Sequence, residues 1–483
     1  MIRYYYRFAT ACALLISLSA CVNVPAPGSG ATLVDLPETW GGSAQPGDID
    51  AQWWLRFDDS LLAAYVAAAD LENPQIGQAV AQLDQARQQA VIAGADRLPQ
   101  LSAMFNASRA QQTLAGSGLG SVFPDVPDGG GATSFHTDNF GLSLNIDWEI
   151  DIWGRIASQH GAALQDYLAS ENRLHAVRQS IAAQASKAYF AVIEAREQVA
   201  FSEETVEALA ETARQVTNRA DVGTIPQSDA EFSIANLESA KAGLEQRHDA
   251  LQQAERQLQL LLREYPSGNI ETAASLPSLP PMPPAGLPAE LLARRPDVAA
   301  AERAVFAAGL RAQAARRSLL PAISLTGAYG NQSNELDRLL NGDSLVWSIA
   351  GQLVQPIFQG GRLRANVALS NAREREAAEA YIATVLTALS EVETALTRDA
   401  FLTRRAQSLL RAAEAAEEAR RIGINRYREG LVPFITVLES QQRAIDARSA
   451  YISTRRARLD NRVDLHLALG GGFGAPTPQE FSQ

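Results

Sequence analysis

The chain of 483 residues is short of several residue types, and each shortage excludes a class of function. Lys187 and Lys241 are the only lysines and the net charge is −12, so we find no basic run that could bind nucleic acid. Only Met1, Met104 and Met282 occur, too few for a thioether relay for soft metal ions. Catalytic motifs such as G-x-S-x-G, H-E-x-x-H and the P-loop are missing. We therefore expect no enzymatic activity, no cofactor and no resident metal.

Histidine is also scarce, and its positions show no metal-binding spacing. The five histidines are scattered along the chain, and we expect them at the surface: His136, His160, His175, His248 and His466.

Long hydrophobic runs are missing after the N-terminus. Phe8–Leu18 is an apolar stretch of eleven residues behind Arg3 and Arg7, which suits an export signal and is too short to span a bilayer. The best later candidate, Ser344–Gly361, has no charge but contains Pro356 and three glutamines, which a helix in lipid would not tolerate. We predict a strand there.

The apolar stretch runs into Leu18-Ser19-Ala20-Cys21, which is similar to a bacterial lipobox. We predict a signal peptide over 1–20, acylation of Cys21, and a lipid-anchored linker over 21–60. Cys12 would leave with the signal, so the mature chain could form no intramolecular disulfide. Val22, by resemblance to sorted lipoproteins, implies the outer membrane, where acyl chains contribute ~0.8 kcal/mol per buried CH₂. The alternative is an ordinary signal peptide followed by a chance cysteine.

The sequence contains an internal repeat that covers most of its length. Arg97–Ser102 matches Leu319–Ser324 at an offset of 222, and Trp153–Arg155 matches Gly360–Arg362 at an offset of 207. The offset changes between the two strand-like segments of each half, where the first half has a longer, Gly-rich loop over 114–137. Because surface loops tolerate insertions, we interpret this as a duplication.

The duplication predicts the organisation of the chain. We expect a first repeat over 61–264, a proline-rich linker over 265–295, a second repeat over 296–470 and a tail over 471–483. Strands are predicted near 99–112, 138–150, 321–332 and 344–356. Long helices are predicted near 155–218, 228–264, 361–427 and 433–469.

The predicted strands alternate between apolar and polar residues. Leu142, Leu144 and Ile146 fall on one face of the second strand, and Ser143 and Asn145 fall on the other. Segments of about ten residues with this pattern suit a membrane barrel, although a half-buried sheet of a soluble domain has the same period.

The helices favour the membrane interpretation. The first long helix of each half contains no proline. A helix of about 60 residues would extend ~90 Å, which a globular protein of this size does not need. Four strands cannot close a barrel, so copies must associate. Two copies give eight strands and a filled interior, whereas three give twelve and leave room for a pore.

These motifs resemble those of the TolC-type outer-membrane factors, in the lipoprotein branch that works with resistance-nodulation-division pumps. The resemblance covers the mature chain and implies an α+β, mainly α fold: a homotrimer with a twelve-stranded barrel, a long periplasmic helical coiled-coil barrel and an equatorial region. It implies an efflux exit duct that docks on a periplasmic adaptor and an inner-membrane pump. The motifs are Gln52-Trp53-Trp54-x-x-Phe57, Asp147–Arg155, Arg294–Val298, Leu320–Gly327 and Pro356–Arg362.

The family also implies a gate at the periplasmic end of the second hairpin. By position, Glu439 occupies a family Asp site, and Thr436 occupies a site that some members also fill with Asp; Tyr427 and Arg428 lie nearby. The matching position in the first half, Phe232, is not acidic. Glu439 could instead be an ordinary solvated helix charge. The hairpin tips predicted to contact the adaptor are Gly223, Thr224, Gly430 and Leu431.

Other motif residues have structural explanations. We expect Trp53, Trp54 and Phe57 to be packing residues, and Gly154 and Gly361 to allow a bend between strand and helix. The segment Arg295-Pro296-Asp297 is typical of a helix start. Two functions remain as alternatives to an efflux duct: a duct for type I protein secretion, and a periplasmic structural lipoprotein without a pore.

Overall fold

The computed structural model describes residues 39–41, 50, 52–113, 134–286 and 288–471. The predicted signal peptide, Cys21, most of the 114–137 loop and the tail from 472 onward lie outside the described residues. Within the described ranges, no helix has both the length and the apolar character needed to cross a membrane. The described residues form two compact units, one built on 85–113, 134–167 and 304–378, the other on 52–84, 168–286, 288–303 and 379–471.

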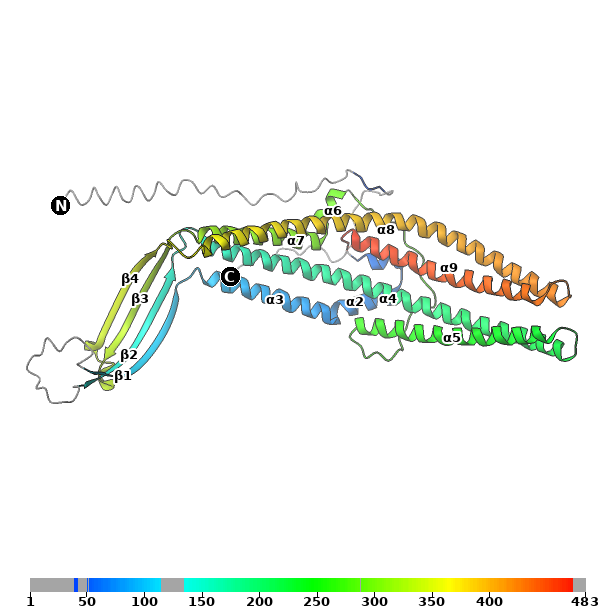
Figure 1. The fold of residues 1–483 in the computed structure, drawn as a ribbon, viewed down its shortest axis with the longest axis horizontal. Helices are drawn as coiled ribbons and strands as arrows, with labels where there is room; N and C mark the ends of the chain where they lie inside the picture. The colour runs from blue at the N-terminus through cyan, green and yellow to red at the C-terminus, as the bar shows by residue number, and fades with distance from the viewer. Residues whose placement is uncertain (1–38, 42–49, 51, 114–133, 287, 472–483) are drawn as a thin grey trace, which may run out of the picture. The chain divides into compact units, whose positions relative to one another are not determined.

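The first unit contains an antiparallel sheet whose strands follow the order β1-β2-β3-β4 (Figure 1). The strands are β1 (Gln100–Thr113), β2 (Ser134–Glu149), β3 (Ala322–Ser333) and β4 (Leu345–Val354). Two short 3-10 turns, η6 (Leu336–Arg338) and η7 (Gly342–Ser344), connect β3 to β4. Each strand begins and ends within four residues of the range expected from the sequence.

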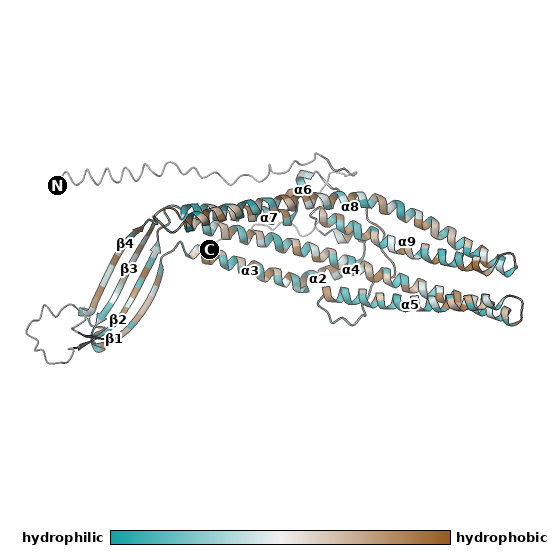
Figure 2. Cartoon of the chain, in the orientation of Figure 1, coloured by the Kyte–Doolittle hydropathy of each residue, from teal (hydrophilic) through white to brown (hydrophobic). Residues whose placement is uncertain are grey.

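The register of the sheet gathers apolar side chains on one face. Phe105 lies opposite Leu142, Leu144 opposite Tyr329, and Tyr329 opposite Trp347. Figure 2 shows hydrophobic residues recurring along the strands. Because side chains alternate between faces, the opposite face carries mainly small and polar residues. The large apolar side chains exposed on this face are Leu101, Phe105, Leu142, Leu144, Tyr329, Leu345, Trp347, Ile349 and Leu353.

The long helices of the two halves have equal lengths. Helices α4 (Arg155–Asp221) and α8 (Arg362–Arg428) each have 67 residues, and α5 (Gln227–Leu261) and α9 (Phe434–Ala468) each have 35. Both bounds of α8 and of α9 lie 207 positions after those of α4 and α5. The two halves therefore build the same helical hairpin.

Two glycines lie at the links from strand to helix, as expected. Gly154 and Gly361 have φ values of +77° and +86°, a conformation that only glycine adopts without strain. A Cβ on Gly154 would also lie 2.9 Å from the Arg317 side chain. Beside this link, the Trp153 indole Nε1 donates to the Pro321 carbonyl at 2.7 Å.

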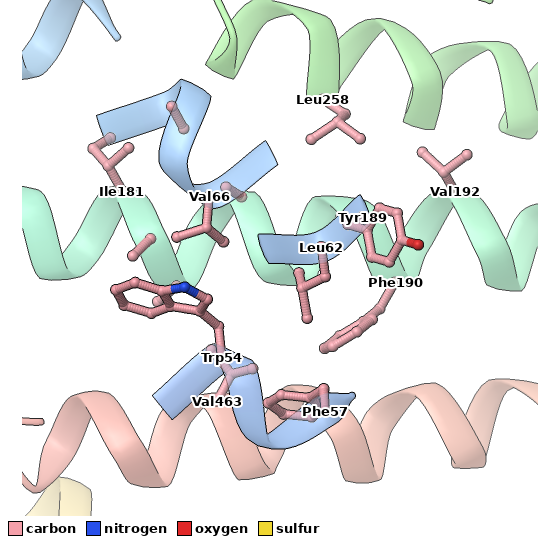
Figure 3. Packing of buried hydrophobic residues seen from close by; sticks show 14 of the residues in the cluster. Trp54, Phe57, Leu62, Val66, Ile181, Tyr189, Phe190, Val192, Leu258 and Val463 are labelled. Atoms are coloured by element: carbon pink, nitrogen blue, oxygen red, sulfur yellow. The ribbon is translucent and has the colours of Figure 1, made fainter. Parts of the chain in front are cut away.

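The second unit is built around an aromatic core. It gathers η3 (Trp53–Phe57), α2 (Ser60–Glu72), the central part of α4 and the C-terminal parts of α5 and α9. Figure 3 shows Trp54, Phe57 and Phe190 among the aliphatic side chains of this core. Trp53, Trp54 and Phe57 are all buried, so their predicted role in packing is confirmed. The remaining α-helices among the described residues are α3 (Pro74–Ala95), α6 (Pro288–Arg294) and α7 (Pro296–Arg317).

Arg295 precedes a helix and also binds residues of two other helices. Pro296 begins α7 and Asp297 lies in its first turn, as the sequence predicted. The buried Arg295 guanidinium also binds both carboxylate oxygens of Asp297, at 2.9 and 2.6 Å, Glu391 Oε2 at 2.5 Å and the Ala468 carbonyl at 3.2 Å. Burial alone would raise the pKa of Asp297, but the hydrogen bonds and charge of Arg295 hold it below its usual value. Arg295 therefore fastens α7 to α8 and α9.

The prediction that the histidines lie at the surface is wrong for His466. This residue of α9 is 0% exposed and stacks on Trp53, with ring centroids 5.3 Å apart and an interplanar angle of 14°. Among the described residues, neither of its ring nitrogens has a hydrogen-bond partner. Burial, and then the charge of Arg462, lowers the pKa of His466 to about 3. The imidazole is thus neutral in the folded chain at physiological pH.

Candidate functional site

The two helical hairpins end in turns of the same chemistry. After α4, Gly223 has φ +72° and the Thr224 N–H donates to the Arg219 carbonyl at 2.9 Å. After α8, Gly430 has φ +77° and the Leu431 N–H donates to the Arg426 carbonyl, also at 2.9 Å. In each turn, a glycine in the left-handed conformation is followed by a residue whose N–H donates to the carbonyl five positions earlier. This is the Schellman motif, which commonly ends helices. A proline, Pro226 in one turn and Pro433 in the other, is the N-cap residue of the return helix.

The hairpin tips present accessible groups. Gly223, Thr224, Gly430 and Leu431 are all exposed. The Thr224 hydroxyl donates to the Arg219 carbonyl at 2.8 Å and is therefore used within its own turn. Leu431, like Val222 in the other turn, exposes most of a large apolar side chain. Each tip thus presents an exposed apolar side chain on a turn that is held by backbone hydrogen bonds.

Near these tips, the hairpins pack against each other. Val216 and Ala230 from the first hairpin share a cluster with Tyr427, Phe434 and Val437 from the second. The rings of Tyr427 and Phe434 have centroids 5.1 Å apart. This small apolar cluster holds the two hairpin ends together.

Polar contacts across the same boundary involve two predicted gate residues. The Tyr427 hydroxyl donates to Asp229 Oδ2 at 3.0 Å, and Arg428 Nη2 donates to Gln215 Oε1 at 3.1 Å. The Arg219 guanidinium lies 5.5 Å from the centre of the Tyr427 ring. Burial, and then the neighbouring Asp229 carboxylate, raises the pKa of Tyr427 to about 12, so the phenol remains a donor. Tyr427 and Arg428 therefore link the second hairpin to the first.

The other two predicted gate residues lie apart from these links. Glu439 and Thr436 occupy exposed positions one turn apart on α9. The Glu439 side chain is 63% exposed, and its nearest cationic partner is Arg443 on the same helix at 4.0 Å. In the single chain, Glu439 is thus a solvated carboxylate.

Sequence reasoning missed Asp229 and Gln215. A signal for Asp229 was available, because it lies 207 positions before Thr436 and is therefore its duplicate. The acid that the second half lacks at Thr436 is present in the first half.

The family model described as "Outer membrane efflux protein" matches residues 66–262 and 287–471, which is most of the chain and both repeats. The chain belongs to this family.

Curated relatives match along nearly their whole length. The chain is 33% identical to the outer membrane protein OprJ of Pseudomonas aeruginosa, over 95% of each protein. It is 32% identical to the pyoverdine export outer membrane protein OpmQ of the same species, over 96% of each. The cation efflux system protein CusC of Escherichia coli K12 is 29% identical, over 88% of this chain and 89% of CusC.

Solved structures agree on the fold. The Campylobacter jejuni CmeC outer membrane channel superposes with a TM-score of 0.82 at 25% identity, over 89% of each chain. These comparisons confirm the TolC-like fold, the recognition of the family and the prediction of an outer-membrane efflux channel with a large periplasmic portion. The members of this family are efflux channels rather than enzymes.

Proposed function

We propose that three copies of this chain form the exit duct of a tripartite efflux system, which passively conducts compounds delivered by an inner-membrane pump and a periplasmic adaptor. The observation that carries the proposal is a four-stranded sheet with an exposed apolar face, joined to two hairpins whose first helices have 67 residues each. Open strand edges are not tolerated in lipid, so the sheet must be closed by other copies. Three copies supply twelve strands, enough to enclose an aqueous pore.

The names of the relatives support a duct that does not select its cargo. OpmQ is named for pyoverdine export and CusC for cation efflux, and both align with nearly all of this chain. One architecture that serves such different compounds is best explained if the pump selects them. For this chain we propose a pump of the resistance-nodulation-division class.

The test is a mass measurement in detergent combined with planar-bilayer recording. We expect the mass of a homotrimer, and conductance only in the trimeric fraction. A stable monomer in lipid would contradict the proposed function.

We propose that the adaptor contacts the hairpin tips at Gly223, Thr224, Gly430 and Leu431. Their exposure and the rigid glycine turns support this assignment. Crosslinking in cells from positions 224 and 431, followed by purification, should recover the adaptor and its pump. Recovery of neither protein would argue against the tips as the docking site.

We also propose that Cys21 carries the lipid anchor, on the strength of the Leu18-Ser19-Ala20-Cys21 motif. Radiolabelled palmitate should enter the wild-type protein and should not enter Cys21→Ala. Label in the variant would rule out Cys21 as the acylated residue. The sheet should still reach the outer membrane, because its apolar face is a second membrane signal.

We propose that the links from Tyr427 and Arg428 to the first hairpin hold the periplasmic end closed. Tyr427→Phe removes one hydroxyl, and with it the bond to the Asp229 carboxylate. Hydrogen bonds to charged groups contribute about 1.5–3 kcal/mol, and partial exposure reduces this value. A loss of about 1.4 kcal/mol would raise the open probability roughly tenfold. We expect this rise in bilayer recordings.

The matched control is Tyr451→Phe, on α9 but outside the hairpin-end cluster. It should leave the open probability unchanged. An equal open probability in Tyr427→Phe and wild type would show that the Tyr427–Asp229 hydrogen bond does not contribute to closure.

For Glu439 we propose a ring of three carboxylates, one from each copy, near the periplasmic mouth. Like charges at close range repel, so entering divalent or trivalent cations should bind there and block the channel. Glu439→Ala should weaken block from the periplasmic side in a planar bilayer, whereas Thr436→Ala should have a smaller effect because threonine carries no charge. Identical block in Glu439→Ala and wild type would leave Glu439 as a solvated helix charge.

A further inference from the structure

The polar face of the sheet carries charge at one end only. Side chains alternate along each strand, so the register assigns every described strand residue to the apolar or the polar face. On the polar face of the described strands, the residues are uncharged except at the end of β2, where Asp147 and Glu149 lie. The uncharged polar residues of this face include Gln100, Ser102, Asn106, Ser143, Asn145, Ser324, Thr326, Gln332, Ser348 and Gln352.

At this end of β2, Glu149 is neutralised by a neighbour and Asp147 is not. Arg155 Nη2, at the start of α4, donates to both carboxylate oxygens of Glu149, at 2.8 Å each. Asp147 is exposed, lies opposite Thr326 of β3, and forms no ion pair with any residue that the structure describes. Its duplicate in the second half, Val354, is uncharged. Each copy therefore contributes one unpaired negative charge to the polar face.

A cavity beside Asp147 has the same sign of charge. It lies where the sheet gives way to the long helices, and its lining includes Asp96, Asp147, Glu149, Arg155 and Thr326. Since Arg155 balances only Glu149, the remaining two carboxylates make this end of the sheet electronegative.

In the proposed trimer, the apolar face meets lipid and the polar face lines the pore. Twelve strands about 4.8 Å apart and tilted by about 40° give a backbone radius of roughly 12 Å. Inward side chains would then place the three Asp147 carboxylates about 8 Å from the pore axis, within the Debye length of about 10 Å at 0.1 M salt. The field of this ring would therefore extend across the whole lumen.

We infer that the three Asp147 carboxylates make the open duct prefer cations to anions. Rings of acidic side chains select cations in channels because they concentrate positive ions along the pore. Three unit charges about 8 Å from the axis raise the local concentration of monovalent cations roughly threefold at 0.1 M salt and lower that of anions by the same factor. The inference rests on the proposed duct and names the compounds that pass it more easily, which are small cations and cargo of net positive charge.

This preference leaves the choice of cargo with the pump. A roughly threefold change in local concentration excludes no compound and only changes how readily each one passes. The ring is also separate from the proposed gate, because Glu439 lies on α9 in the other compact unit. Asp147 should therefore act on ions in the barrel even when the gate carboxylates are removed.

The test is the reversal potential of open-channel currents in a planar bilayer with a KCl gradient around 0.1 M, recorded in a Glu439→Ala background. Asp147→Asn keeps the size of the side chain and removes its charge, so the K⁺/Cl⁻ permeability ratio, averaged over the duct, should fall roughly threefold. Thr326→Lys retains Asp147 and places an ammonium group directly opposite it, so the ratio should fall to the same extent. At about 1 M KCl, where the Debye length is about 3 Å, wild type and variants should have similar ratios.

Two matched variants test whether the position of the charge matters. Asn145→Asp/Asp147→Asn moves the carboxylate one pleat along the polar face, about 7 Å, and should restore the wild-type ratio. Asp138→Asn removes a carboxylate from the apolar side of the same strand, where it lies 3.4 Å from Arg109, and should leave the ratio unchanged.

The outcomes separate this inference from the proposed function. A conducting trimer whose ratio is equal in Asp147→Asn and wild type, or is not restored in Asn145→Asp/Asp147→Asn, overturns the role of Asp147 and leaves the duct intact. A difference that persists at about 1 M KCl also overturns it, because salt screens the field of the ring. A wild-type trimer that does not conduct overturns the proposed function itself.

Discussion

Asp399→Ala should lower the free energy of unfolding by about 3–5 kcal/mol, because it leaves a buried arginine without its counter-charge. Asp399 lies on α8 and accepts from Arg462 Nη2 on α9 at 3.0 Å. The Arg462 side chain is 3% exposed and that of Asp399 is 14% exposed. A second guanidinium nitrogen of Arg462 donates to the Pro280 carbonyl in the proline-rich linker. Without Asp399, the positive charge would remain buried against neutral groups.

Two further variants identify the cause of the lost stability in Asp399→Ala. In Asp399→Ala/Arg462→Met, both charges are gone and an apolar side chain fills the space, so most of the lost stability should return. Glu417→Ala, on the same helix, removes an exposed carboxylate that pairs with Arg420 one turn away, and should cost less than ~1 kcal/mol. Denaturant unfolding of the detergent-solubilised protein, followed by helical circular dichroism, measures all three. If the double variant is as unstable as Asp399→Ala, buried charge is not the cause.

The sequence predicted the fold well because each element is determined by local periodicity. The strands alternate because one face meets lipid, and the pattern in Leu142, Ser143 and Leu144 is readable without any partner. The ends of the long helices could be predicted because both hairpin turns contain glycine and proline, with Gly223 before Pro226 and Gly430 before Pro433. The largest difference was at β2, which begins four residues before its predicted start.

The candidate site was less predictable because its contacts are long-range. Tyr427 could be singled out from its motif, but its partner Asp229 lies 198 positions earlier in the chain. Arg295 was read as part of a helix start, and its bond to Glu391 spans 96 positions. His466 was placed at the surface because nothing in its immediate sequence indicates that it stacks on Trp53. Such pairs depend on helix packing, which local patterns do not specify.

The buried His466 should make the protein sensitive to acid. Its imidazole faces Trp53, and the charged groups that influence it are Arg462, Arg56 and Asp50. Because the pKa of His466 is lowered from 6.5 to about 3 by folding, the unfolded chain binds the extra proton first. Stability from the neutral imidazole is therefore complete above pH 6.5 and is lost as the pH falls toward about 3. Each pH unit in this window should cost about 1.4 kcal/mol.

Comparison of wild type with His466→Leu isolates this effect. Leucine is apolar at every pH, so the variant should have close to wild-type stability at pH 7, where the imidazole is also uncharged. Carboxylates elsewhere titrate in both proteins, and their contributions cancel in the difference. Between pH 6.5 and 4.5, the wild type should lose roughly 2–3 kcal/mol more than His466→Leu in denaturant unfolding. Parallel stability curves for the two proteins would show that His466 can be protonated in the folded chain, through an opening of the core around Trp53.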